Sequence, residues 1–230
     1  MEAVVQPGFG RSQGRDPPSF QDRLCTVPDV LPRALFASLR AEILKLAETE
    51  RTYIPAHKKG ATIGYDILRK TAPNIVALYR DAHYQKFISG IVGNPLEPTP
   101  IQDNSSLSVL IYDRPGDHIG WHYDHNFYRG RHFTVLITME NVDRDQSGLS
   151  GAKLLVKDST GAEIEFPTPA NTLVLFEGAK TLHKITPIGE GERRVVLSMT
   201  YCTDPRNSRV QEVARKIKDT AFFGARALWT

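Results

Sequence analysis

Six short apolar runs between residues 106 and 201 constrain the fold of this chain more than any other feature. They are SLSVLIY, HFTVLITM, AKLLVK, AEIEF, TLVLF and RRVVLSMTY. Turn-forming segments such as RPGD, SGLSG, DSTG, TPAN and GEGE separate them. Many short strands with turns between them are typical of a β-sandwich or barrel, whereas alternating strands and helices would indicate a parallel sheet. The second half of the chain is therefore predicted to form a β core.

The residues before this region are predicted to pack helices outside the β core. Segment 31–50 has apolar residues at helical spacing, and Pro32 suits a first turn. These apolar residues are Leu35, Leu39, Ile43 and Leu46. A second helix is predicted over about residues 73–91. The polar segment 53–68 between them is predicted to be an ordered loop or short strands.

The domain organisation is predicted to be simple, because the chain has no internal repeat and no long linker. Residues 1–19 are rich in Gly, Pro, Gln and Arg and are expected to form a flexible tail. Residues 20–230 are expected to form one domain. Its parts are a helical region over 31–92, a β core over about 105–203 and a C-terminal helix over about 208–220.

Composition indicates an ordinary soluble protein, with 40% hydrophobic and 24% charged residues. The net charge of +3 does not favour a nucleic-acid or membrane partner. Two distant cysteines are no disulfide framework, so we expect a reducing compartment. No apolar stretch resembles a signal peptide or a membrane span. A cytoplasmic protein is expected, and its oligomeric state is left open.

Three residues form a candidate metal site. His122 and Asp124 are two positions apart, and such residues point to the same face if they lie on one strand. His183 comes later, just after the TLVLF run. Two histidines and one carboxylate form the facial triad of non-haem iron(II) oxygenases, which leaves open positions for a co-substrate and dioxygen.

Two further residues are candidates for binding a diacid co-substrate. Arg193 follows His183 by ten residues and opens the last β run. An arginine binds a carboxylate through two parallel hydrogen bonds. Tyr112, at the end of the first β run, could add a hydroxyl. Arg194 is the rival of Arg193, because adjacent strand residues face opposite sides and only one can enter the core. The spacing favours Arg193.

The segments HYD and LHKITPIGEGERR resemble the iron(II)/2-oxoglutarate-dependent dioxygenase superfamily, and its prolyl-hydroxylase-like branch in particular. The resemblance covers roughly residues 107–201. It implies a mainly β fold with flanking helices, the double-stranded β-helix or jelly roll. It also implies Fe(II), 2-oxoglutarate and O2 as cofactor and co-substrates.

The resemblance implies a role for each candidate residue. His122, Asp124 and His183 would bind the iron. Arg193 would pair with the distal carboxylate of 2-oxoglutarate, and Tyr112 is in register with a frequent co-substrate-binding tyrosine. The reaction would release succinate and CO2 and oxidise a substrate C–H bond. Radical halogenases of this superfamily usually have Gly or Ala in place of the carboxylate ligand, so Asp124 favours hydroxylation or a related oxidation over halogenation.

The substrate is expected to be a small molecule, such as an amino acid or a biosynthetic intermediate. A peptide or protein hydroxylase is the first alternative. An AlkB-like nucleic-acid demethylase is the second, since NSSLSVLIYDRPGDHIGWHYD resembles that group. Those enzymes carry a second arginine six residues after the first, where this chain has Met199 or Thr200. A metal-binding β-sandwich without catalysis is the remaining alternative.

Four residues are candidates for substrate contact. His118 and His125 flank the metal ligands, although both could be exposed loop residues. Asn126 could bind a polar substrate group or could cap its own loop. Trp229, in the apolar C-terminal segment FFGARALWT, could cover the active site.

Overall fold

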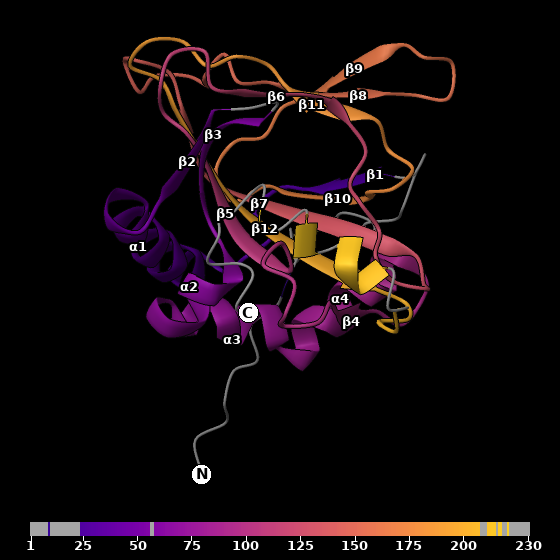
Figure 1. Ribbon diagram of the computed structural model, residues 1–230. Helices are drawn as coiled ribbons and strands as arrows, with labels where there is room; N and C mark the ends of the chain where they lie inside the picture. Colours follow the sequence, from indigo (N-terminus) through magenta and orange to yellow (C-terminus); the bar gives the residue numbers. More distant parts are fainter. Residues whose placement is uncertain are drawn as a thin grey trace.

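Two layers of antiparallel strands face each other, and helices cover the outer side of one layer (Figure 1). The computed structural model describes residues 9, 24–55, 58–207, 211–214, 216–217 and 220. The larger layer has the order β1-β10-β7-β12-β5. Its strands are β1 (Leu24–Val27), β10 (Leu173–Glu177), β7 (His132–Val142), β12 (Arg193–Cys202) and β5 (Leu107–Tyr112).

The smaller layer has the order β6-β11-β8-β9 and lies at the top of Figure 1. Its strands are β6 (His118–His122), β11 (His183–Ile185), β8 (Leu154–Lys157) and β9 (Glu163–Phe166). Strand β3 (Lys58–Ile63) pairs with β5 and with β6, so it joins the two layers into one curled sheet. Strand β2 (Thr52–Pro55) pairs with β3, and β4 (Glu97–Pro98) pairs with β12. The predicted double-stranded β-helix is confirmed.

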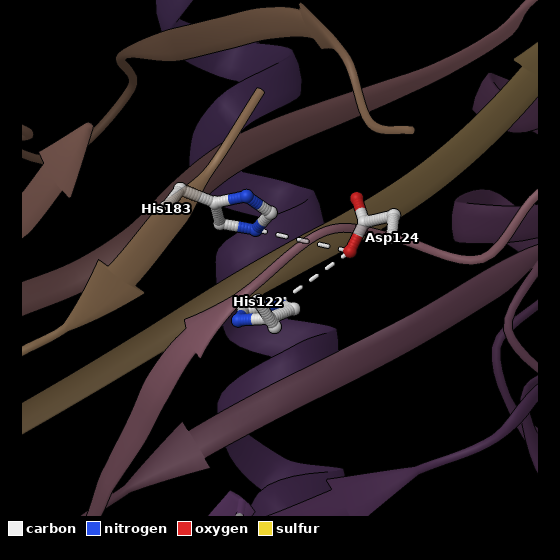
Figure 2. Close-up of side chains that lie close together, drawn as sticks. All are labelled: His122, Asp124 and His183. Carbon is white, nitrogen blue, oxygen red and sulfur yellow. Dashed lines mark ion pairs between the residues drawn. The ribbon is translucent and has the colours of Figure 1, made fainter. Parts of the chain in front are cut away.

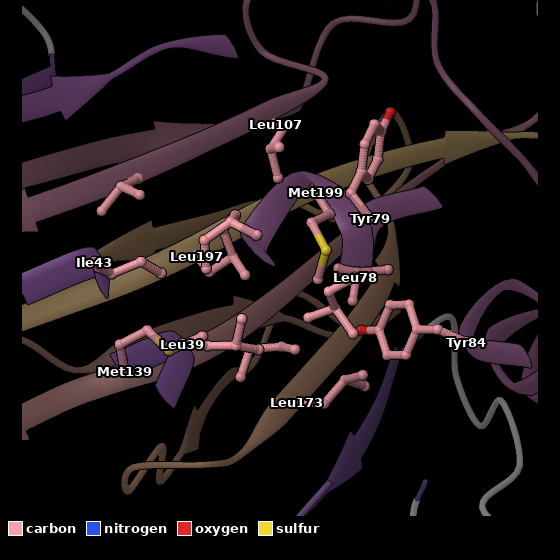
Figure 3. Close-up of a cluster of buried hydrophobic side chains, with 14 of the residues drawn as sticks. Leu39, Ile43, Leu78, Tyr79, Tyr84, Leu107, Met139, Leu173, Leu197 and Met199 are labelled. Atoms are coloured by element: carbon pink, nitrogen blue, oxygen red, sulfur yellow. The ribbon is translucent and has the colours of Figure 1, made fainter. Parts of the chain in front are cut away.

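Helices pack on the outer face of the larger layer through apolar side chains (Figure 3). The helices are α1 (Arg33–Thr49), α2 (Tyr65–Thr71), α3 (Pro73–Arg80) and α4 (Ala82–Val92). Leu39 and Ile43 of α1 are fully buried in the same cluster as Leu197 of β12. Their spacing of four residues puts both on one helix face. This packing uses the outward-facing residues of β12 and leaves the inward-facing ones for the space between the layers.

The helical prediction for residues 73–91 was wrong in one respect, because α3 ends and α4 begins at Asp81. Asp81 has an extended backbone, with φ −67° and ψ 124°, and its carboxylate accepts a hydrogen bond from the amide of Tyr84 at 2.7 Å. It therefore caps α4 and interrupts the apolar period. Segment 53–68, predicted as an ordered loop or short strands, contains part of β2, the whole of β3 and part of α2, so the short strands are confirmed. Helix α2 was not predicted.

The six predicted runs all form strands, while β1, β4, β6 and β11 are not among these runs. Of the predicted tail the structure describes only Phe9, whose ring centroid lies 5.3 Å from that of Tyr84. The predicted C-terminal helix is described only in part, and its described residues 211–214, 216–217 and 220 are helical. Cys25 and Cys202 are buried and free. Among the described residues, no helix has the length and apolar character that a membrane span requires.

Candidate metal and co-substrate site

The two histidines of the candidate triad face each other across paired strands. His122 is the last residue of β6, His183 is the first residue of β11, and the two are direct partners in the antiparallel ladder. Directly opposed residues in such a pair point to the same side of the sheet. Their ring centroids are 4.1 Å apart. The pairing of β6 with β11 therefore brings together two candidate ligands that are far apart in the sequence.

Asp124 lies beyond the end of β6, so the prediction that one strand places His122 and Asp124 on the same face was wrong. Contacts with other elements fix its position. Its amide donates a hydrogen bond to the carbonyl of Gly178 at 3.0 Å, and Thr134 Oγ1 donates to its Oδ2 at 2.5 Å. A Cβ atom on Gly178 would lie 2.7 Å from Asp124 Oδ2. Only glycine at 178 leaves space for this carboxylate.

The three side chains converge on one point (Figure 2). Asp124 Oδ1 lies 3.6 Å from His122 Nε2 and 3.8 Å from His183 Nε2. Each residue offers one ligand atom, and these atoms all lie within 4.8 Å of one another. The Nδ1 atoms face the carbonyls of Gly120 and Thr181 at 2.8 and 2.9 Å. With Nδ1–H donating there, both Nε2 atoms would be free to bind a metal.

The charge states of the triad suit a divalent metal. Burial raises the pKa of Asp124, but His183, His122 and the hydrogen bond from Thr134 lower it more, so its pKa lies well below the ordinary value. Burial lowers the pKa of His183, and Asp124 offsets this only in part. An ionised carboxylate and a neutral imidazole are the forms that bind metal. The donor set of two nitrogens and one carboxylate oxygen fits Fe(II).

A cavity of about 280 Å³ lies beside the triad, between the two layers. Alternate residues of β12 and β5 line its floor on the larger layer, as the strand period requires, and residues of β7 and β10 complete this floor. Arg194 and Tyr112 are direct cross-strand partners at one end of this floor. Both are buried, with exposed fractions of 1%.

Arg194, and not Arg193, faces this cavity, so the choice of Arg193 from its spacing was wrong. Arg193 points to the other side of β12, where its Nη2 lies 2.6 Å from Glu48 Oε1 and its Nε lies 3.9 Å from Glu140 Oε1. Adjacent strand residues alternate between the two faces, so this placement turns Arg194 inward. The spacing rule located the correct strand end but missed by one residue.

Arg194 is a buried cation without a counterion in the described part of the chain. Its Nη1 donates to Thr168 Oγ1 at 2.5 Å and to the carbonyl of Ala152 at 3.3 Å, while its Nε has no partner. Burial lowers its pKa to about 10 and Tyr112 partly offsets this, so the side chain remains charged at neutral pH. An unpaired buried charge is costly. The site therefore fits an anionic ligand between Arg194 and the metal.

Comparison with sequence families agrees with this geometry. A family model described as 2OG-Fe(II) oxygenase superfamily matches residues 107–201, and one described as Halogenase D matches residues 18–148, more than half of the chain. The chain belongs to the 2OG-Fe(II) oxygenase superfamily and to the family described as Halogenase D. Oxygenases of this superfamily use Fe(II), 2-oxoglutarate and O2. The predicted cofactor and co-substrates are thus those of the family.

Solved structures confirm the fold of this oxygenase. The non-heme α-ketoglutarate-dependent epimerase SnoN from nogalamycin biosynthesis superposes with a TM-score of 0.63 at 16% identity, over 78% of this chain and 77% of its own. A Pseudomonas putida prolyl-4-hydroxylase superposes with a TM-score of 0.59 at 17% identity, over 80% of this chain and 94% of its own. A Trichoplax adhaerens prolyl hydroxylase superposes with a TM-score of 0.62 at 16% identity, over 80% of this chain and 84% of its own. The prolyl-hydroxylase-like resemblance is confirmed at the level of the fold. No curated protein sequence matches the chain significantly.

Of the four residues predicted to contact the substrate, His125 lines the cavity, whereas the other described ones, His118 and Asn126, do not. His125 lines the cavity, and its ring stacks on Phe127 with centroids 5.8 Å apart. Asn126 caps its own loop, because its side chain donates to the carbonyl of Gly130 and accepts from the amide of Tyr128. His118 does not line the cavity, and its Nδ1 lies 2.8 Å from the carbonyl of Gly116. Trp229 lies outside the described residues.

Four residues of the site were not predicted from the sequence. Thr134 and Gly178 hold Asp124, and no local pattern distinguishes them from other strand residues. Ser108 and Ser198 line the cavity as cross-strand partners. Counting in steps of two from Arg194 along β12 would have found Ser198, provided that Arg194 had been chosen as the inward-facing arginine.

Proposed function

We propose that this oxygenase hydroxylates a C–H bond of a small molecule, such as an amino acid or a biosynthetic intermediate. One oxygen atom of O2 would enter the substrate, and the other would enter succinate as 2-oxoglutarate loses CO2. The observation that carries the proposal is the buried, unpaired Arg194 in the same cavity as the triad. Such a cation is suited to the distal carboxylate of 2-oxoglutarate.

The side chains would divide the work as follows. His122, Asp124 and His183 would hold the iron, which supplies the activation of O2 when bound. Arg194 would bind the distal carboxylate of 2-oxoglutarate in place of the predicted Arg193, and Tyr112 lies beside it. The partly apolar cavity would exclude water and orient the substrate carbon toward the metal.

Halogenation is the second candidate, because a family model described as Halogenase D matches the chain. Asp124 supports hydroxylation instead, since its carboxylate would fill the coordination position that a halide needs. Thr134 and Gly178 hold this carboxylate in the triad. The discriminating assay supplies chloride or bromide during turnover. A halogenated product from the unmodified enzyme would overturn the choice.

A succinate-release screen tests the proposal. The protein is incubated with Fe(II), 2-oxoglutarate and a panel of amino acids, other small metabolites and peptides. Methylated oligonucleotides test the demethylase alternative, and the His183→Ala variant provides the blank. We expect succinate and a product that has gained one oxygen atom with a small molecule. A product formed only from peptides would favour the peptide hydroxylase, and a product formed only from oligonucleotides would favour the demethylase. Failure to bind 2-oxoglutarate would reject the proposed function altogether.

We also propose that the enzyme acts in the cytoplasm. The supporting observation is that its two cysteines are buried, free thiols, as is usual in a reducing compartment. Fractionation of cells that express the full chain tests this proposal.

A further inference from the structure

The polarity of the cavity floor changes with every second residue along β12 and β5. Three pairs of cross-strand partners line this part of it, and each pair is one step of two residues from the next. The first pair is charged and phenolic, Arg194 with Tyr112. The second is apolar, Val196 with Leu110. The third is Ser198 with Ser108, which we call the serine pair. An apolar step therefore separates the serine pair from the arginine.

The serine pair presents two hydroxyl groups to the cavity. Ser108 and Ser198 are buried, with exposed fractions of 4% and 8%, and both line the cavity. Neither hydroxyl has a hydrogen-bond partner within the described part of the chain. Buried polar groups are nearly always hydrogen-bonded, and those that line a cavity take their partner from water or a ligand. The pair is therefore prepared to receive a hydrogen-bonding group from the cavity.

The serine pair lies toward the end of the cavity floor where Asp124 is held. The next inward residue of β12 after Ser198 is Thr200, and its cross-strand partner is Thr134, which donates to Asp124. Two residues of an antiparallel strand span about 7 Å, and the four residues from Ser198 back to Arg194 span about 14 Å. The serine pair is thus nearer to the element that holds Asp124 than to the arginine.

Resting on the proposed function, we infer that the serine pair is the specificity-determining contact for the primary substrate and binds a hydrogen-bonding group on it. Each serine hydroxyl both donates and accepts, so hydroxyl, amine and carboxylate groups share the required chemistry. The cavity volume of about 280 Å³ must also hold 2-oxoglutarate. It is at the lower end of ligand pockets. The substrate is therefore compact where it meets the pair.

Binding measurements on the full chain test this inference without turnover. The protein is loaded with Mn(II) and 2-oxoglutarate, and dissociation constants are measured by calorimetry for matched probes. One probe set is homoserine, 2,4-diaminobutyrate, glutamate and the methyl isostere norvaline. A second set consists of compact alcohols, amines and carboxylic acids with their methyl isosteres. The variants are Ser108→Ala, Ser198→Ala and both together, with the exposed Ser159→Ala as the matched control.

We expect at least one polar probe to bind at least tenfold more tightly than its methyl isostere. Each single variant should weaken that probe about three- to tenfold, which is the value of one hydrogen bond, and Ser159→Ala should not. The affinity for 2-oxoglutarate should stay within twofold, which also shows that the variants fold. The inference is overturned if no polar probe is preferred, if the variants leave the preference intact, or if they weaken 2-oxoglutarate equally. Loss of 2-oxoglutarate binding in the unmodified protein would instead reject the proposed function.

Discussion

Arg193 and Arg194 are adjacent residues of β12 with opposite electrostatic surroundings. Arg193 lies near two glutamates, Glu48 and Glu140. Arg194 has only neutral partners, Thr168 Oγ1 and the carbonyl of Ala152, within the described part of the chain. A fully buried guanidinium with neutral partners gains most from an added carboxylate, because no protein anion competes for it.

Replacement of each arginine by alanine should therefore have very different effects. Removing one partner of a buried charge pair costs about 3–5 kcal/mol, so Arg194→Ala should weaken 2-oxoglutarate binding by at least about 100-fold. Arg193→Ala should leave that affinity within about twofold, since its ion pairs lie on the other face of the sheet. Calorimetry with the Mn(II)-loaded protein measures both. Equal effects from the two variants would contradict the assignment of Arg194.

Thr134 supports the candidate metal ligand Asp124. Its hydroxyl donates to Asp124 Oδ2 at 2.5 Å, which orients Oδ1 toward the two histidines. Thr134→Val keeps the shape and removes the hydrogen bond. Loss of such a supporting contact typically lowers metal affinity 10–100-fold, and we expect a loss of about tenfold. Titration with Mn(II) measures it, with the exposed Thr26→Val as control. Unchanged metal affinity in Thr134→Val would refute this role.

Strands with long apolar runs could be predicted from the sequence, whereas several short strands could not. The six runs that were predicted are rich in β-branched and other apolar residues, and several are buried on both faces. Strands β6 and β11 carry the histidines of the triad but have weak strand signals. Strand β11 has only 3 residues, and β6 has the sequence HIGWH, with a central glycine and one β-branched residue. The three candidate ligands could be named from residue types and order, and the structure brings them together. The geometry of the triad depends on long-range pairing, which no local pattern records.

The choice between Arg193 and Arg194 illustrates a second limit of sequence reasoning. A shift of one residue exchanges the two faces of a strand, so an error of one position changes the role of every side chain. The pairing of β12 with β7 also shifts register between Val195 and Val196. The spacing from His183 therefore located the strand but did not show which of its residues face inward. The division between α3 and α4 was missed for a related reason, because a capping carboxylate overrides an apolar period that continues through it.

Asp81 provides a test at the level of helices. Its carboxylate caps α4 through the amide of Tyr84, and loss of such a cap costs about 1 kcal/mol. Asp81→Ala should lower Tm by about 2–4 °C in a chain of this size. Asp81→Asn, which keeps the accepting oxygen, should lie close to the unmodified protein. Thermal unfolding followed by circular dichroism compares the three, and an equal loss in both variants would show that the cap is not responsible.

At the scale of the whole molecule, ligand binding should stabilise the fold. The triad draws on β6, the segment after it and β11, while Arg194 comes from the other layer. A ligand that binds only the folded state at 100 times its dissociation constant adds about 2.7 kcal/mol. Mn(II) with 2-oxoglutarate should therefore raise Tm by about 5–10 °C, and a chelator should reverse the rise. The Arg194→Ala variant should keep the response to Mn(II) and lose the further response to 2-oxoglutarate. A full response in that variant would show that the co-substrate binds elsewhere.

The two layers contribute different parts of the active site, and this separation has a consequence for evolution. The histidines of the triad belong to β6 and β11 in the smaller layer, whereas Arg194 and the serine pair belong to β12 and β5 in the larger one. Mutations at Ser108 or Ser198 alter the floor without touching the strands that hold the histidines. New substrates could thus be acquired by drift at two positions while the oxidative chemistry is inherited unchanged. A library randomised at Ser108 and Ser198 alone would be a small and informative starting point for redirecting this enzyme.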